Sequence, residues 1–408
     1  MRYSTSLFCQ ILQIIPRARF EQLVKETGAE CQAKGFKSWT QCVAMLFCQL
    51  ALAHSLREIR HGLASSCGKL NHLGLTTAPP KSTLAYANEH RPYELWRRLF
   101  YELLDQCQAH APGKKKKFRF KNKLYSIDAT TIDLCLNLFP WADFRQTKGA
   151  VKLHMMLDHD GYFPVFAHVT EAKVHEVNTL RLLDLPKGSI VAMDRGYHDF
   201  RMFERWTRDG IFFVTRLKRS NAYRVVERLA VPQRGNVLAD ELIEFSGYAS
   251  HQKCPSVMRR IVVWDAANEK EVALLTNHLD FGATTLAQIY RDRWEIELFF
   301  KLLKQQLRIK SFVGTSPNAL QTQIWTALIA VLLLKYMQFC SRCGLPLCTL
   351  LALLRWNLFT HRELWAWLDD PFAVPPEPPP IQLALPFGTA SPPDDETQAP
   401  TGGWFRRN

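Results

Sequence analysis

The chain has 408 residues, of which 47% are hydrophobic and 22% are charged, so it is long enough for two or three globular domains and is not mainly disordered. Its formal net charge of +14 and pI near 9.3 favour a polyanionic partner, although charge alone does not separate nucleic acid from an anionic membrane surface. The longest apolar run, Ile324 to Leu334, is too short to span a bilayer and no signal peptide is recognised, so we expect no membrane insertion.

Residues 1–113 are predicted to form an all-helical N-terminal domain. Apolar residues recur at three- and four-residue spacing in four segments, 20–36, 38–53, 55–65 and 93–107. The stretch "PPKSTLAYANEHRP" predicts a further helix, with Ser82 or Thr83 as its N-cap. Because this region is separate from the acidic residues described below and leads into a basic run, we expect it to bind DNA.

The basic run at 114–123, "KKKKFRFKNK", holds seven basic residues in ten and is expected to link the helices to a strand. Its charges favour a solvated linker, whereas the interleaved Phe118 and Phe120 favour a contact with nucleic acid. The sequence leaves both interpretations open.

Residues 114–219 show the alternation of an α/β domain. Strands are predicted at 123–134, 150–158, 162–170, 189–193 and 211–218, with helices at 174–186 and at 199–210, the latter closed by Gly210. In chain order this gives β-β-β-α-β-α-β, the first part of a catalytic core.

Two further segments and a tail follow. Short alternating or β-branched runs predict an inserted β-rich subdomain at 220–283. Residues 284–368 return to helix, beginning with "YRDRWEIELFFKLLK", and residues 369–408 form a tail that is expected to be disordered, since ten of the 22 prolines lie from Pro371 onward.

Three carboxylates occupy positions that an α/β sheet brings together. Asp128 lies on the first strand, Asp194 at the C-terminal end of the fourth, and Glu297 on the helix after the fifth. Carboxylates gathered in one crevice repel one another unless cations lie between them, and oxygen-only ligands select Mg²⁺ or Mn²⁺. Two such ions about 3.5–4 Å apart can promote in-line attack on a phosphodiester.

Each acid also has a purely structural interpretation. Asp128 before Ala-Thr-Thr is compatible with a turn cap, and Asp194 in "DRGY" with an Asx-turn. The helix at 290–304 carries Tyr290, Arg293, Glu297 and Lys304 within a stripe about 60° wide, which alone is typical of a surface helix with ion pairs. Only the joint placement of the acids points to a catalytic site.

At these residues the sequence resembles the IS4-type DDE transposases of bacterial insertion sequences. The helix has that family's signature at Tyr290, Arg293, Glu297 and Lys304, and "IDAT" around Asp128, "MDRGY" and "LLTN" are similar to its other motifs. The resemblance implies an RNase H-like catalytic domain with a β-strand insertion before the Glu297 helix. It also implies cut-and-paste transposition of the protein's own element.

The resemblance further assigns the site residues. Asp128, Asp194 and Glu297 would be catalytic and would ligate two Mg²⁺ ions, which Mn²⁺ can replace. Tyr290, Arg293 and Lys304 would bind DNA phosphates and grip a flipped base while a DNA hairpin forms. Trp264 is a candidate for the stacking aromatic, and its alternative is a core aromatic of the inserted sheet.

The expected partners are the element's terminal inverted repeats, target DNA and a second copy of the chain in a synaptic dimer. Eleven cysteines without a disulfide-like framework suggest reduced thiols in a cytosolic setting. The resemblance implies the bacterial cytoplasm and association with the nucleoid. Two other classes of function stay open, an RNase H-like structure-specific nuclease and a catalytically silent DNA-binding regulator.

Overall fold

A computed structural model describes residues 5–374 apart from 32, 34, 67–69, 111–117, 119, 146–147, 234, 308 and 310–311. The helices are α1 Leu7–Gln13, α2 Arg17–Glu26, α3 Ser38–Ala51, α4 Leu56–Ala64, α5 Lys81–His90, α6 Glu94–His110, α7 Val177–Leu180, α8 Phe200–Asp209, α9 Tyr248–Lys253, α10 Ala283–Asp292, α11 Trp294–Gln306, α12 Pro317–Cys340, α13 Leu347–Asn357 and α14 Leu364–Asp369. The strands are β1 Leu124–Leu134, β2 Asp143–Arg145, β3 Lys148–Asp158, β4 Pro164–Glu171, β5 Ile190–Met193, β6 Phe212–Arg216, β7 Tyr223–Arg228, β8 Val237–Phe245, β9 Met258–Asp265 and β10 Lys270–Thr276. Short 3₁₀ helices lie at Asn71–Leu73, Pro140–Ala142 and Arg195–Tyr197.

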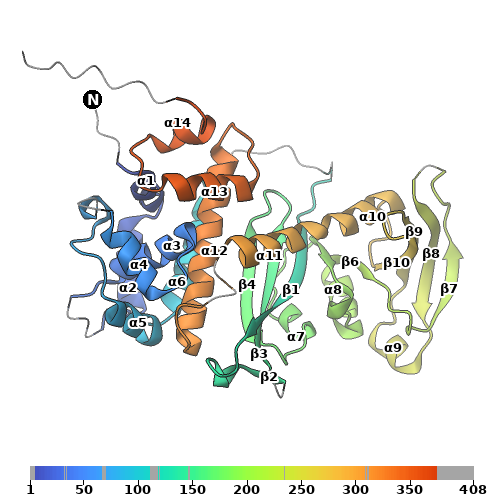
Figure 1. Cartoon of the computed structure of the whole chain (residues 1–408). Coiled ribbons are helices and arrows are strands. Elements are labelled where there is room, and N and C mark those ends of the chain that lie inside the picture. The colour runs from blue at the N-terminus through green and yellow to red at the C-terminus, as the bar shows by residue number, and fades with distance from the viewer. Residues whose placement is uncertain are drawn as a thin grey trace, which may run out of the picture. The chain divides into compact units, whose positions relative to one another are not determined.

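One sheet of ten strands runs through the molecule in the order β2-β3-β1-β5-β6-β10-β9-β8-β7, with β4 paired to β3 (Figure 1). The strand β3 pairs antiparallel with both β1 and β4, whereas β5 pairs parallel to β1 and β6 parallel to β5. The predicted order β-β-β-α-β-α-β is therefore confirmed, with the short β2 added. The mixed α/β class is confirmed with it.

Three details of the predicted elements are wrong. The helix expected at 20–36 ends at Glu26, and Gly28 just beyond it has the left-handed φ of 64° that is typical of a helix end. The helix expected at 174–186 is limited to Val177–Leu180, and Leu182 is 56% exposed, so the apolar residues here do not form the single buried stripe that holds a longer helix. The helix expected to be capped by Ser82 or Thr83 instead begins at Lys81. Pro80 precedes it with φ −61° and ψ 142°, and an extended proline leads directly into the first turn.

The predicted inserted strands are continuous with the core sheet. β10 returns to pair antiparallel with β6, and β9, β8 and β7 extend the sheet outward from it. Phe118 and Phe120 stack on each other, with ring centroids 5.0 Å apart, and Phe120 contacts Phe281 at 4.9 Å. These rings pack against the protein core, while the lysines at 114–117 lie outside the described residues.

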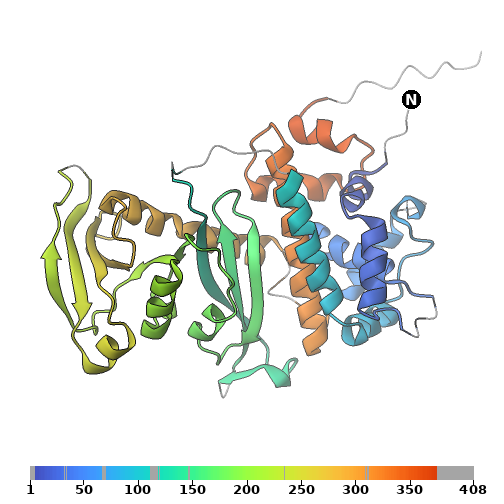
Figure 2. The ribbon, with the colours of Figure 1, turned by 180° about the vertical axis from the view of Figure 1, so that it is seen from behind.

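The N-terminal helices share a hydrophobic core with the C-terminal helices and with one end of the sheet. Figures 1 and 2 both show α12 beside α6, between the N-terminal helices and the strands. The core cluster there combines residues such as Trp96, Leu328 and Leu153. α12 is long and apolar enough to cross a membrane, yet 78% of its most apolar window is buried inside the protein, as expected of a core helix. The limits of the predicted domains stay predictions, and most of the proline-rich tail, from residue 375, lies outside the described residues.

Candidate active site

The base of the candidate site is one row of residues across four neighbouring strands. Ile127 of β1 lies opposite Met193 of β5 in a parallel pair, so the next residues, Asp128 and Asp194, are neighbours at the point where β5 ends. Adjacent strands lie about 4.8 Å apart and residues in register point to the same face of a sheet. The two predicted aspartates are thus brought together by strand register.

The row continues into the predicted insertion. Ala192 lies opposite Val214, which places Arg216 of β6 two residues on, beside the end of β5. Arg216 in turn lies opposite Leu274 of β10. All four residues of this row, Asp128, Asp194, Arg216 and Leu274, line one pocket of about 760 Å³. We call it the acidic pocket, and its far wall is built by β9 and β10.

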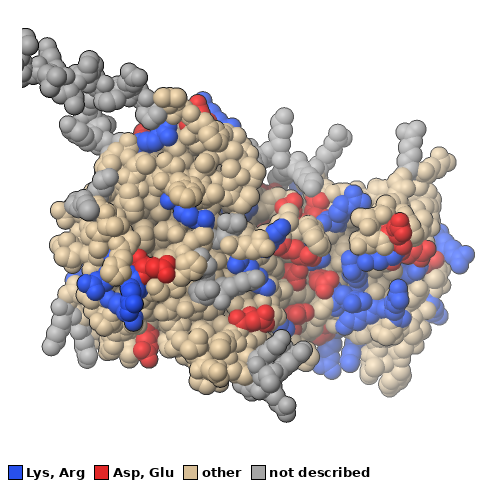
Figure 3. Space-filling view, viewed as in Figure 1, with Lys and Arg blue, Asp and Glu red and all other residues tan. Residues whose placement is uncertain are grey.

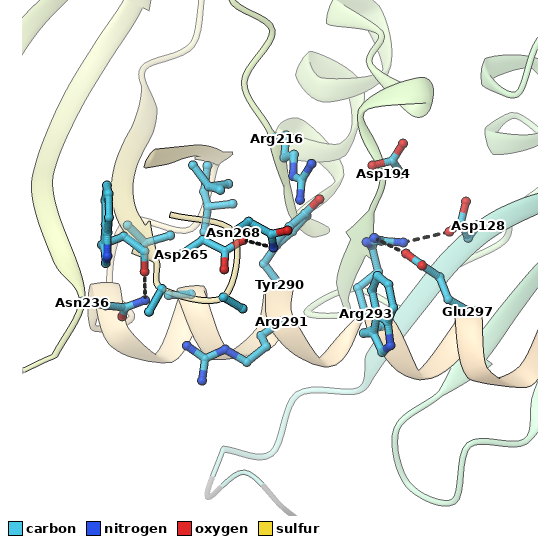
Figure 4. Close-up of a pocket in the computed structure, with 18 residues that line it drawn as sticks. Asp128, Asp194, Arg216, Asn236, Asp265, Asn268, Tyr290, Arg291, Arg293 and Glu297 are labelled. Carbon is cyan, nitrogen blue, oxygen red and sulfur yellow. Dashed lines mark hydrogen bonds and ion pairs between the residues drawn. The ribbon is translucent and has the colours of Figure 1, made fainter. Parts of the chain in front are cut away.

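The near wall is the helix that carries the third predicted acid. α10 ends at Asp292 and α11 begins at Trp294, but Arg293 between them keeps helical backbone angles (φ −54°, ψ −27°). The side chains predicted to share one stripe of a single helix therefore still lie on one side. Tyr290, Arg293 and Glu297 all line the acidic pocket (Figure 4). The structure therefore brings all three predicted carboxylates to one cavity.

Arg293 bridges two of those carboxylates. Its Nη1 donates to Asp128 Oδ2 at 2.8 Å and its Nη2 to Glu297 Oε1 at 2.7 Å, as the dashed lines in Figure 4 show. The Arg293 side chain is only 7% exposed. Burial alone would lower the pKa of Arg293, but Tyr290, Asp128 and Glu297 outweigh it and raise that pKa. The Arg293 guanidinium therefore stays charged, and its positive charge lies between the carboxylates of Asp128 and Glu297 and reduces their mutual repulsion.

Asp128 is the most perturbed carboxyl of the site. Burial raises the pKa of Asp128 to about 6, against the opposing effects of Arg293 and of the Ala129 backbone N–H, which donates to Asp128 Oδ1 at 2.8 Å. The negative charges of Asp194 and Glu297 raise the pKa further. Four acids, Asp128, Asp194, Asp265 and Glu297, and three arginines, Arg216, Arg291 and Arg293, line the pocket, so one negative charge is left for an additional cation.

The turn that carries Asp194 is anchored from the opposite face of the sheet. Tyr197 is the last residue of the short 3₁₀ helix that begins directly after Asp194. It is fully buried, and its hydroxyl lies 3.3 Å from His154 Nδ1. Burial first, then the charges of Asp128 and nearby acids, raise the pKa of Tyr197. Burial lowers the pKa of His154 to about 3, so the imidazole is neutral.

Tyr290 and Lys304 occupy different positions along the helix. Tyr290 is buried between two cations, with the guanidinium carbons of Arg216 and Arg293 5.5 and 5.6 Å from its ring centroid. Lys304 lies outside the pocket lining and donates from Nζ to the carbonyl of Thr131 at 2.7 Å. The stripe thus follows β1, with Arg293 at Asp128 and Lys304 three residues further along the strand.

Trp264 lies in the pocket wall and is 41% exposed, so the alternative of a core aromatic is wrong. Its backbone is fixed by Asn236, whose carbonyl accepts from the Trp264 N–H at 2.7 Å. A second tryptophan, Trp294, was not predicted and is 58% exposed in the same pocket. It lies four residues after Tyr290, about 40° away around the helix, and this spacing could have placed it on the same stripe.

The pocket offers the donor set of a hard divalent cation. Asp128, Asp194 and Glu297 supply oxygen only, which suits Mg²⁺ and Mn²⁺. In the described part of the chain, no three His, Cys, Asp or Glu side chains already form a metal-holding group. At this site Arg293 holds one oxygen of Asp128 and one of Glu297. By ligand type, the three carboxylates are the residues that could hold such a cation.

Comparison with known families shows the class of protein to which this sheet and its carboxylates belong. Residues 119–333 match the family described as Transposase DDE domain, and the chain belongs to that family. Residues 4–76 match a second family, described as Domain of unknown function (DUF4372).

Curated relatives of the chain are named as probable or putative transposases. The chain is 28% identical over 302 residues to the probable transposase for insertion sequence element IS5377 of Geobacillus stearothermophilus, covering 71% of this chain and 74% of the relative. It is 29% identical over 302 residues to the putative transposase y4zB of Sinorhizobium fredii, covering 73% and 83%. The predicted membership of the bacterial insertion-sequence transposases is thus confirmed, while the IS4 type stays a prediction.

Among solved structures, a piggyBac transposase synaptic complex with hairpin DNA, determined by cryo-EM, is similar with a TM-score of 0.45 and 10% identity. The likeness covers 92% of this chain and 83% of that chain. It is too distant to bear on the fold or function of this protein.

Proposed function

We propose that the protein is the DDE transposase of an insertion element of the IS4 type, which cuts the ends of its element and joins them to target DNA. The observation that carries this proposal is the acidic pocket, where three carboxylates from β1, the end of β5 and α11 line one cavity. A wall of aromatic and basic side chains beside the acids suits a DNA strand better than a small molecule.

Asp128, Asp194 and Glu297 are the proposed metal ligands and catalytic residues. Two Mg²⁺ ions bound there, or Mn²⁺ in their place, would activate a water or a 3′-hydroxyl and stabilise the leaving oxygen at the phosphodiester. The chain's own contribution is to hold the two aspartates in register on adjacent strands and to bring Glu297 to the same pocket from α11. With a pKa of about 6, Asp128 is mostly charged at neutral pH even without metal.

Arg293 has two successive roles in this proposal. Without metal it neutralises Asp128 and Glu297 by the two hydrogen bonds described above. Released from those oxygens, the Arg293 guanidinium would be available for a DNA phosphate, to which arginine binds strongly. Tyr290 and Lys304 are proposed to position the same strand, and Trp264 to stack on a base displaced during a hairpin step.

The remaining parts of the proposal concern partners and fold. The strand order β4-β3-β1-β5-β6 supports an RNase H-like core, with β7 to β10 as its insertion. The N-terminal helices are proposed to bind the terminal inverted repeats, in a homodimer that brings two ends together. The protein is proposed to work in the bacterial cytoplasm on nucleoid DNA.

One experiment separates this function from its rivals. The full chain is incubated with Mg²⁺ and DNA that carries both flanks of the element. End-specific cleavage followed by joining is expected, whereas a structure-specific nuclease nicks branched DNA regardless of sequence and a silent regulator binds without cutting. Either of the last two results contradicts the proposal.

A further inference from the structure

The helices α3 and α4 form a sharply bent pair within the N-terminal region whose family has no known function. The bend between them is 97°, and only residues 52–55 connect them. Leu52 makes the turn by adopting the left-handed conformation (φ 59°). Two helices at about 90–120° joined by a turn of 3–4 residues are the geometry of a helix-turn-helix, whose second helix enters the major groove of DNA.

The second helix of the pair, α4, is held rigidly against the first. Its apolar side, Leu56, Ile59 and Leu63, is buried. Gly62 packs directly against Phe47 of α3, since a Cβ at that position would lie 2.7 Å from Phe47 Cζ. Glycine is therefore required for the close approach of the two helices.

The start of α4 is fixed by a reciprocal cap. Ser55 Oγ accepts from the Glu58 N–H at 3.2 Å, and Glu58 Oε2 accepts from the His54 N–H at 2.8 Å. This arrangement satisfies two backbone donors at once. It also engages the one acid of the helix at its N-terminus rather than beside the basic residues.

The outward side of α4 is cationic. Arg57, Arg60 and His61 are exposed and lie within about 100° of one another around the helix, with His61 opposite the buried side and Arg60 at its border. Within the described chain, neither Arg57 nor Arg60 has an ion-pair partner. Figure 3 shows a small group of Lys and Arg side chains over the helical end of this face and a larger group over the end with β6 to β10.

We infer that α4 is the helix that reads DNA sequence, with Arg57 and Arg60 directed at base edges in the major groove. The inference rests on the proposed function and specifies which surface recognises the ends. Arginine is suited to this role because its guanidinium bonds to guanine O6 and N7 in pairs. The same unpaired charges favour polyanionic DNA over any neutral partner.

The test compares wild type with Arg57→Gln, Arg60→Gln and the double variant, each as the full chain. Fluorescence anisotropy measures binding to a duplex with the terminal sequence of the protein's element and to a shuffled duplex of equal length and composition, without divalent metal. Arg205→Gln is the matched control, because it removes a 64%-exposed arginine of α8. The thermal midpoint of each variant verifies folding.

We expect the double variant to lose at least about tenfold in affinity for the end duplex, while its affinity for the shuffled duplex falls far less. The control variant should keep the preference of the wild type. If the double variant keeps that preference too, α4 is not the reading helix, although the catalytic proposal stands. If the wild type itself shows no preference, the inference fails with end binding, and Mg²⁺-dependent cleavage of the same DNA then decides the catalytic proposal separately.

Discussion

Two arginine–carboxylate pairs of the same sheet show how a structural and a functional ion pair differ. Between β8 and β9, Arg259 donates from Nε and Nη2 to both oxygens of Asp240, at 2.8 and 2.7 Å, and from Nη1 to the carbonyls of Leu279 and Phe281. In the acidic pocket, Arg293 divides its two Nη groups between Asp128 and Glu297, and its buried Nε has no acceptor among the described residues.

The two ion pairs differ in how many of their hydrogen-bonding groups have a partner. Arg259 and Asp240 are 6% and 3% exposed, and the bidentate pair uses each of the guanidinium nitrogens. Glu297 is 34% exposed and each acid of the pocket keeps oxygens that Arg293 does not use. A pair whose groups are all satisfied stabilises the fold, whereas an incomplete pair that faces a cavity is prepared to exchange partners.

The largest effect on stability is expected at the structural pair. Asp240→Ala leaves the charge of Arg259 buried without its carboxylate and should lower the free energy of unfolding by about 3–5 kcal/mol. The control on the same strand is Glu244→Ala, whose partner Arg224 is 72% exposed, and it should cost at most about 1 kcal/mol. Urea denaturation measures both, and equal losses would remove the distinction between the two kinds of pair.

The acidic pocket should respond to pH in the opposite direction from an ordinary salt bridge. Since the pKa of Asp128 is raised to about 6 and an unfolded aspartate titrates near 4, the folded state binds the extra proton between these values. Stability from this group is therefore lost as pH rises from about 4 to 6.

Relative to the wild type, Asp128→Asn should gain about 2 kcal/mol in unfolding free energy between pH 4 and pH 7. Asp158, whose pKa burial also raises to about 6, is present in both proteins and cancels in the difference. Parallel denaturation curves at several pH values measure this difference, and a value independent of pH contradicts the assigned environment of Asp128.

The smallest expected effect concerns metal affinity. Arg293→Gln removes the guanidinium that competes for Asp128 and Glu297, so Mn²⁺ should bind about tenfold more tightly in the absence of DNA, or about 1.4 kcal/mol. The control is Arg291→Gln. Arg291 lines the same pocket, and its replacement removes the same charge without a contact to these acids. Electron paramagnetic resonance of free Mn²⁺ gives both affinities, and an equal change in the two variants would refute the competition.

Sequence reasoning succeeded where a local pattern determines the structure. The strand-like patterns of apolar and polar residues correctly predicted β1, β3 and β4. Gly210 was correctly predicted to end α8, and it has the left-handed conformation (φ 70°) that favours glycine. The positions of Asp128 on the first predicted strand and of Asp194 at the end of the fourth were enough to predict that they lie together, because strand ends and neighbouring helix faces of an α/β sheet converge in one crevice.

The features that were missed depend on contacts distant in sequence. The local sequence does not indicate that β10 pairs with β6. We therefore did not predict that the insertion is continuous with the core sheet or that it forms a wall of the pocket. The buried packing of α12 against α6 and α3 unites the N-terminal helices with the sheet in one core. The bridge from Arg293 to Asp128 joins residues 165 positions apart and follows only from the tertiary fold.

The most direct test of the account is the effect of Glu297→Gln on cleavage and on binding of end-containing DNA in Mg²⁺ and in Mn²⁺. Cleavage should fall by at least about a thousandfold, or about 4 kcal/mol in the barrier, with folding and gel-shift affinity close to wild type. Asp128→Asn and Asp194→Asn should do the same, whereas Glu295→Gln, two residues away on α11 and outside the pocket lining, should cut normally. A Glu297→Gln protein that cleaves at near wild-type rate would contradict the three-carboxylate site.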